Sequence, residues 1–162
     1  MQNQHKMGVL KSYINFQLLD SIVERYESGD GSARNLINSF SEYKQFEPTI
    51  TLGCISCKET TLTLLAGMIF FVRTKNLPPP EEDKFKWSNH LENLQGIQKS
   101  EDVRIWAIRV IRNAIAHWSE DNSGVEFLDS ATRFQSRSGS LTLPDTGLHE
   151  LVMQMYGYSQ RM

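Results

Sequence analysis

Apolar side chains recur every three or four residues along much of this 162-residue chain, the spacing of helices with one buried face. The first such stretch covers residues 9–27, and a cluster of glycine, serine and aspartate at 28–32 predicts a turn after it. A shorter helix is expected over 33–46. It must end before Pro48, because the residue preceding a proline disfavours helical geometry.

The middle of the chain predicts three further helices. Residues 55–75 are apolar on nearly every side, which indicates a helix central to a bundle. Three prolines at 78–80 stop that helix, since they supply no backbone donors and fix an extended path. A more polar helix is expected over 82–98, and another over 100–118 with Ser100 as its N-cap.

The pattern changes near the C-terminus. Between residues 125 and 143, β-favouring residues are scattered among Ser, Thr and Gly, which predicts one or two short strands or an ordered loop. A final helix is expected over 146–156. We therefore predict one all-α domain over 1–162, a bundle of about five helices with a short extended or β-hairpin segment before the C-terminal helix.

Composition narrows the function classes. The 17 Lys and Arg residues against 19 Asp and Glu give a net charge of −2, which excludes the uniformly basic surface of a non-specific nucleic-acid binder. Any RNA contact must be local. The longest apolar run, 62–72, is about half the length needed to cross a bilayer, and the polar N-terminus lacks the apolar stretch of a secretion signal. We expect a cytoplasmic protein without a membrane partner.

Cys54 and Cys57 form a single Cys-x-x-Cys pair. A zinc site of the usual kind needs a second pair, and a redox site needs a βαβ context, and the sequence provides neither. Two small thiols at the start of a buried helix is the favoured interpretation. A zinc ion shared across a dimer is the alternative. We expect no metal site in the single chain and no cofactor.

The helix expected over 100–118 divides into two unequal sectors. Most of its circumference is apolar, which predicts burial over most of its surface. The remaining stripe has no acidic residue past the first turn, and it holds Arg109, Arg112, Asn113 and His117.

An exposed helix face ordinarily mixes both charge signs. A stripe of one sign on a mostly buried helix needs an anion, a partner chain or a carboxylate from a neighbouring helix. Glu42 and Glu59 are possible partners within the chain. With such partners, the arginines and the histidine would have a purely structural role.

The segment Arg112-Asn-Ala-Ile-Ala-His117 resembles the Arg-x4-6-His motif of HEPN domains, in the form with a polar residue after the arginine. The resemblance covers residues 9–118 and is specific mainly in these six. It implies a small helical bundle that dimerises, and many such proteins are metal-independent endoribonucleases acting as toxins or in phage defence. Arg112 and His117 of both protomers would then line a shared cleft, with RNA as substrate and an antitoxin protein as a possible partner.

These residue types suit RNA cleavage by attack of the 2′-hydroxyl, which leaves a 2′,3′-cyclic phosphate. Histidine titrates near neutrality and can be base or acid, and the guanidinium of Arg112 can grip phosphate oxygens in a fork. Asn113, one turn before His117, would orient the imidazole or bond the phosphate. Because one histidine cannot easily be base and acid in a single step, a two-fold dimer would supply the second.

Several neighbouring residues extend the hypothesis. Arg109 and Trp118 are predicted to bind RNA, with Trp118 stacking on a base or, alternatively, packing in the core. Arg133 and Arg137 are candidates for a basic track. Many HEPN toxins with a nucleotidyltransferase antitoxin have a tyrosine two residues after the histidine, where this chain has Ser119. The alternative to a nuclease is a non-catalytic dimerisation or RNA-binding module on the same scaffold.

Overall fold

The computed structural model describes residues 2–118 and 123–161. Within these residues the helices are α1 (Gln2–Glu27), α2 (Gly31–Lys44), α3 (Pro48–Ser56), α4 (Lys58–Ile69), α5 (Val103–Ala116) and α6 (Asp145–Gln160). Three 3-10 turns are η1 (Thr74–Asn76), η2 (Pro80–Glu82) and η3 (Trp87–His90). The strands are β1 (Glu92–Gln95), β2 (Gly124–Phe127), β3 (Ala131–Ser136) and β4 (Gly139–Pro144).

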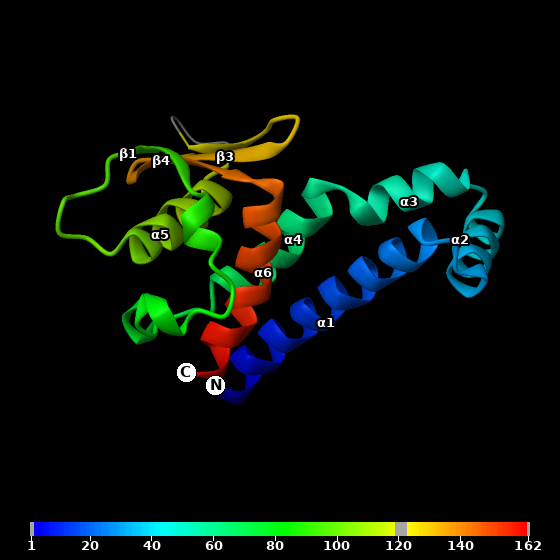
Figure 1. Cartoon of the computed structure of the whole chain (residues 1–162), viewed down its shortest axis with the longest axis horizontal. Coiled ribbons are helices and arrows are strands. Elements are labelled where there is room, and N and C mark those ends of the chain that lie inside the picture. Colours follow the sequence, from blue (N-terminus) through cyan, green and yellow to red (C-terminus); the bar gives the residue numbers. More distant parts are fainter. Residues whose placement is uncertain (1, 119–122, 162) are drawn as a thin grey trace.

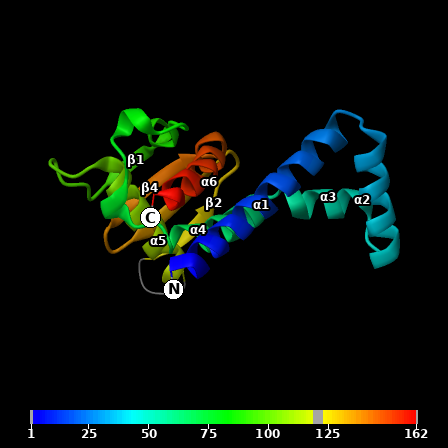
Figure 2. The ribbon, with the colours of Figure 1, turned by 90° about the horizontal axis from the view of Figure 1, so that it is seen from below.

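The molecule consists of a body and a projecting helical arm (Figure 1). One half of α1 packs beside α4 and α6 in the body, and the other half continues outward to α2 and α3, as the second view also shows (Figure 2). The arm leaves large apolar side chains exposed, namely Leu36, Phe40, Tyr43, Phe46 and Ile50. The hydrophobic core therefore lies in the body, and the arm contributes little to it.

The sheet is antiparallel throughout, with strand order β1-β4-β3-β2. Along β3, burial alternates with the two-residue period of a strand, so that Phe134 points inward and Arg133 outward. Phe134 joins Leu141 and Leu143 of β4 in the core that α5 shares. The inner face of the sheet thus packs against α5, the helix that contains the motif.

The predicted all-α class is wrong, because the described chain is a mixed α/β structure with a four-stranded sheet. The segment before α6, expected as a short extended or hairpin element, contributes three strands, β2, β3 and β4. β1 joins them from residues 92–95, across a long stretch of chain. Pairing over such separations is fixed by tertiary contacts, which local helical periodicity does not report.

The helix expected over 82–98 is also wrong. This stretch contains η3 and β1 and two residues with positive φ, Asn93 at 52° and Gly96 at 91°, which no α-helix accommodates. Trp87 at its centre is fully buried, and Asp83 just before η3 is 4% exposed. Long-range contacts of these two side chains hold the segment in place of helical hydrogen bonds.

The expected central helix over 55–75 is divided and displaced toward the N-terminus. α3 begins at Pro48, a residue suited to the first helical position. Cys57 then has extended geometry, with φ −75° and ψ 157°, and separates α3 from α4. α4 ends at Ile69, and its core residues are Leu62, Leu65, Met68 and Ile69.

By length and composition alone, the segment Pro48–Ile69 is apolar enough to span a membrane, with a mean hydropathy of 1.2. The segment is longer than the run 62–72 that the sequence pattern singled out. Only 22% of its most apolar window is buried. The central helix of a soluble protein meets the same criterion, so the criterion by itself assigns no location.

Candidate active site

α5 forms because its apolar residues recur at helical spacing and because its first turn is capped. The carboxylate of Asp102 accepts a hydrogen bond from the backbone N–H of Arg104 at 2.8 Å, so the N-cap is Asp102 and not Ser100. The buried residues of the helix are Arg104, Trp106, Ala107, Ile108, Val110, Ile111 and Ala114. The prediction of a helix buried over most of its surface is confirmed.

The motif residues occupy the exposed edge near the end of this helix. Arg112 and Asn113 are half-buried and His117 is exposed. His117 is the C-cap, and its backbone N–H donates to the carbonyl of Asn113 at 3.0 Å. All three residues therefore lie at the C-terminal end of α5, a helix that belongs to the body and not to the arm (Figure 1).

A hollow of about 90 Å³ lies where the end of α5 meets the turn between β3 and β4. Its lining residues are Asn113, His117, Ser123, Ser136 and Arg137. Each of these side chains can donate a hydrogen bond, and no carboxylate is among the described lining residues. Arg112 is not part of the lining, so the structure brings Asn113 and His117 together in this hollow and leaves Arg112 beside it.

The turn of the β3–β4 hairpin, formed by Arg137 and Ser138, is fixed to α5 by two side chains. Asn113 donates from Nδ2 to Oγ of Ser138 at 3.2 Å, and the buried indole of Trp106 donates to the Ser138 carbonyl at 3.2 Å. Gly139 follows with φ 130°, which favours glycine. The side-chain amide of Asn113 thus contacts the hairpin, a partner that helical periodicity did not indicate.

The two predicted RNA-binding residues have different surroundings. Arg109 forms an ion pair with Glu101 at 2.7 Å, and its side chain is 40% exposed. Trp118 is 45% exposed, and its ring lies 6.0 Å from that of Phe127. Trp118 is therefore partly packed and partly open to solvent, whereas the charge of Arg109 is already balanced. Ser119 lies outside the described residues.

Comparison of the chain with protein-family models, with curated proteins and with solved structures gives no match. The resemblance to HEPN domains therefore rests on the motif from Arg112 to His117.

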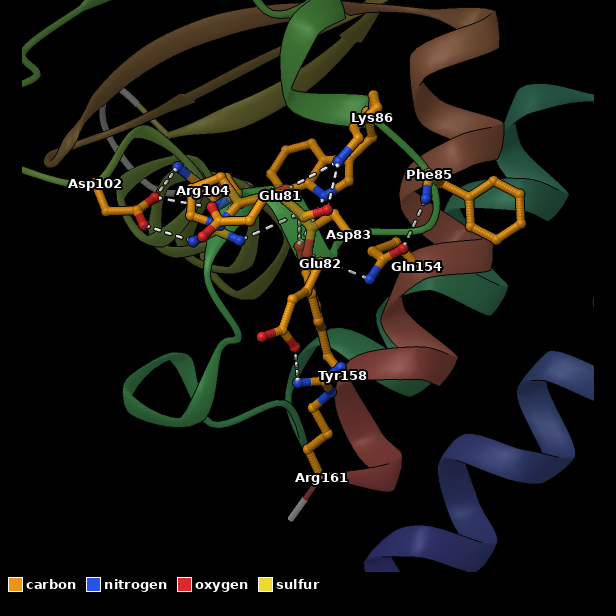
Figure 3. A network of polar contacts seen from close by, with 12 residues as sticks. Glu81, Glu82, Asp83, Phe85, Lys86, Asp102, Arg104, Gln154, Tyr158 and Arg161 are labelled. Carbon is orange, nitrogen blue, oxygen red and sulfur yellow. Dashed lines mark hydrogen bonds and ion pairs between the residues drawn. The ribbon is translucent and has the colours of Figure 1, made fainter.

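A buried polar network lies at the opposite end of α5, and the sequence pattern did not predict it (Figure 3). Arg104 is 3% exposed and pairs with Asp102 through two hydrogen bonds and with Asp83 at 3.2 Å. Tyr158 of α6 donates to Asp83 at 2.6 Å, and Trp87 donates to the hydroxyl of Tyr158. The network joins the irregular segment after η2 to α5 and α6.

The hydrogen bonds in this network shift the pKa values of its members, and they keep Arg104 and Asp102 in their charged forms. The hydrogen bonds from Arg104 lower the pKa of the Asp102 carboxyl. Burial alone lowers the pKa of Arg104, but its hydrogen bonds with Asp102 and Asp83 outweigh burial and raise that pKa. Burial, and next the hydrogen bond to Asp83, raise the pKa of Tyr158. The sequence feature that could have indicated this network is Arg104, an arginine within the apolar sector of the helix.

Glu42 and Glu59, the carboxylates suggested as partners of the motif helix, do not have that role. Both are exposed, on α2 and α4, and within the described chain neither forms an ion pair with α5. Glu101 and Asp102, directly before α5, and Asp83 are the carboxylates that pair with its arginines. Glu101 and Asp102 lie next to the arginines because they directly precede α5, and Asp83 reaches Arg104 from the segment after η2.

The cysteines lie at the junction of α3 and α4. Cys54 is exposed and Cys57 is half-buried, with its thiol 3.3 Å from the carbonyl of Cys54, so they do not start one buried helix. In the part of the chain that the structure describes, no group of three or more metal-binding side chains is found. Cys57 also lines a cavity of about 540 Å³ with α1 and the start of α6, remote from the motif.

Proposed function

We propose that this protein is a metal-independent endoribonuclease of the HEPN type. The observation that carries the proposal is the contrast among the three arginines of α5. Arg104 and Arg109 are neutralised by carboxylates, whereas Arg112 has no ion pair with any described residue. A half-buried cation without an anion among the described residues favours an external one, and the phosphate of RNA is such an anion.

His117 supplies the proton chemistry in this proposal. Its side chain is exposed at the end of α5, five residues after Arg112, so an RNA strand can reach it. One imidazole removes the proton of the 2′-hydroxyl, whose oxygen attacks the phosphorus, while the 5′-oxygen leaves and takes up a proton. Arg112 stabilises the charge that builds on the phosphate. The products carry a 2′,3′-cyclic phosphate and a 5′-hydroxyl.

The proposed enzyme is a homodimer with a composite site. Each chain has one histidine on the motif helix, and a second imidazole would let a general base and a general acid act in the same step. A two-fold axis beside the end of α5 would place two copies of His117 on the same phosphate. The corresponding biological role is that of a toxin or phage-defence effector, with an antitoxin as a possible partner.

Expression in a bacterial host tests the proposal. We expect growth arrest by the wild type and its loss in Arg112→Ala and in His117→Ala, both of which substitute side chains outside the core and should remain folded by circular dichroism. Arg161→Ala is the matched control, because Arg161 follows α6 and pairs with Glu82 at 2.8 Å, so its loss should leave most of the arrest. Arrest that persists in both motif variants would instead support the non-catalytic RNA-binding module.

A further inference from the structure

The hollow between the end of α5 and the β3–β4 turn has the features of an oxyanion site. Its volume of about 90 Å³ has room for about three water molecules, which suits a phosphate group. The hydroxyls of Ser123 and Ser136, the imidazole of His117 and the guanidinium of Arg137 line it, together with Asn113, whose amide bonds Ser138. The guanidinium of Arg137 is always charged, so it favours an anion over a cation here.

Arg137 is the permanent positive charge of this set. Its side chain is exposed, and no described carboxylate forms an ion pair with it. Arg133, on the outer face of β3, is instead paired with Glu126 at 2.8 Å. The two arginines are four residues apart, yet only Arg137 lines the hollow beside His117.

The turn that holds Arg137 is fixed in place by α5. Asn113 bonds the Ser138 hydroxyl and Trp106 bonds the Ser138 carbonyl, each at 3.2 Å. The backbone N–H of Ser138 also donates to Oγ of Ser136, at 3.2 Å, within the turn. These three hydrogen bonds to Ser138 restrain the backbone of the turn. Arg137, the adjacent residue, therefore loses less conformational entropy when its guanidinium binds an anion.

We propose that this hollow is a phosphate subsite in which Arg137 binds the oxyanion and Asn113 is a positioning residue that acts through Ser138. As a site for an RNA phosphate, the subsite rests on the ribonuclease function proposed above, and as an oxyanion site it does not. Asn113 in this account holds the hairpin, in place of the direct contact with imidazole or phosphate that the sequence suggested.

Titration with inorganic phosphate, followed by the amide signals of the labelled protein in NMR spectra, tests the subsite without any catalysis. We expect phosphate to shift the signals of His117 and Ser138 in the wild type. Arg137→Ala should weaken binding by about tenfold or more, because a charge-assisted hydrogen bond is lost. Arg133→Ala, the matched control, should bind as the wild type does.

Substitutions in the turn test the positioning role. Asn113→Ala and Ser138→Ala should each weaken phosphate binding, and the double variant should lose no more than either one, because both remove the same hydrogen bond. Ser138→Thr keeps the hydroxyl and should retain binding. Unfolding midpoints equal to that of the wild type would show that these variants lose phosphate binding through a local change in the turn.

The outcomes separate the subsite from the nuclease. Phosphate binding that is unchanged in Arg137→Ala, or that shifts only signals remote from His117 and Ser138, overturns the subsite even if RNA is cleaved. Absence of RNA cleavage by the wild type overturns the nuclease, while the phosphate titration still decides the subsite. If both proposals hold, Arg137→Ala should raise KM for RNA more than it lowers kcat.

Discussion

The arginines of α5 differ in what neutralises each one. Arg104 is buried with Asp83 and Asp102, so it joins α5 to the segment after η2 and to α6. Arg109 has a partly exposed partner in Glu101, a kind of pair that contributes little to stability. Arg112 has no such partner among the described residues. At the scale of the residue, Arg104 stabilises the fold and Arg112 is available to a ligand.

Tyr158 reports on the buried network through its response to pH. Its folded pKa is raised, so its contribution to stability is complete below the unfolded pKa of 10.0 and is lost as the pH rises above that value. Tyr158→Phe should cost about 1–3 kcal/mol at neutral pH, because Asp83 loses a donor and Trp87 an acceptor. The variant should also lose less stability than the wild type between pH 9 and pH 11, as estimated from the titration range of tyrosine. Urea unfolding across this range checks both effects, and equal alkaline losses in the two proteins would contradict the assignment.

At the scale of the element, the β3–β4 hairpin and α5 form one unit. Gly139 has φ 130°, and a Cβ at this position would lie 2.1 Å from the carbonyl oxygen of Gln95. The close approach of β1 to β4, together with the contact of Trp106, therefore requires glycine here. The placement of Arg137 depends on that packing.

Gly139→Ala should destabilise the protein by about 2 kcal/mol or more, from the steric contact and the unfavourable φ. Gly53→Ala is the matched control in α3, where a Cβ would meet nothing within 4 Å, and it should stabilise by about 0.5–1 kcal/mol. Thermal unfolding of both variants measures the two effects. Similar changes in the two proteins would contradict the packing described for the hairpin.

Sequence periodicity predicted the elements whose packing is local. It placed α2, α5 and α6 within a few residues at their ends and found α1 without its first seven residues, because each has an apolar face that recurs at helical spacing. It failed over 82–98, where polar residues at helical spacing form η3 and β1. There the structure depends on Trp87 and Asp83 reaching α5 and α6, and on β1 pairing with β4. Such contacts leave no periodic signal.

The sequence predicted only those residues of the candidate site that lie on a single helix. Arg112, Asn113 and His117 belong to one helix, so helical spacing alone predicts that they share the stripe outside its apolar sector. Arg137 is 20 residues beyond His117 in the chain, and only the pairing of β3 with β4 returns it to the end of α5. The contact between Asn113 and Ser138 depends on that pairing as well.

At the scale of the whole molecule, the helix that contains the motif belongs to the body, and the arm exposes several large apolar side chains (Figures 1 and 2). The proposed composite site needs two bodies that meet near the ends of their α5 helices. Each active site then contains His117 from both chains. Loss of either imidazole inactivates the shared site, and this property distinguishes a composite site from two independent ones.

Mixing wild type with His117→Ala tests this arrangement. After equal amounts are unfolded and refolded together, about one quarter of the dimers contain two wild-type chains. A composite site should therefore give about one quarter of the RNA cleavage of the same total amount of wild type. Independent sites would give about one half, and that result would contradict the shared cleft.

The ends of cleaved RNA test the central claim most directly. Purified protein is incubated with total RNA in the presence of EDTA, and the new ends are analysed chemically. The account predicts cleavage that leaves 2′,3′-cyclic phosphate and 5′-hydroxyl ends and that is lost in folded Arg112→Ala and His117→Ala. Cleavage that requires Mg²⁺, ends that carry a 5′-phosphate, or equal cleavage by the two variants would contradict it.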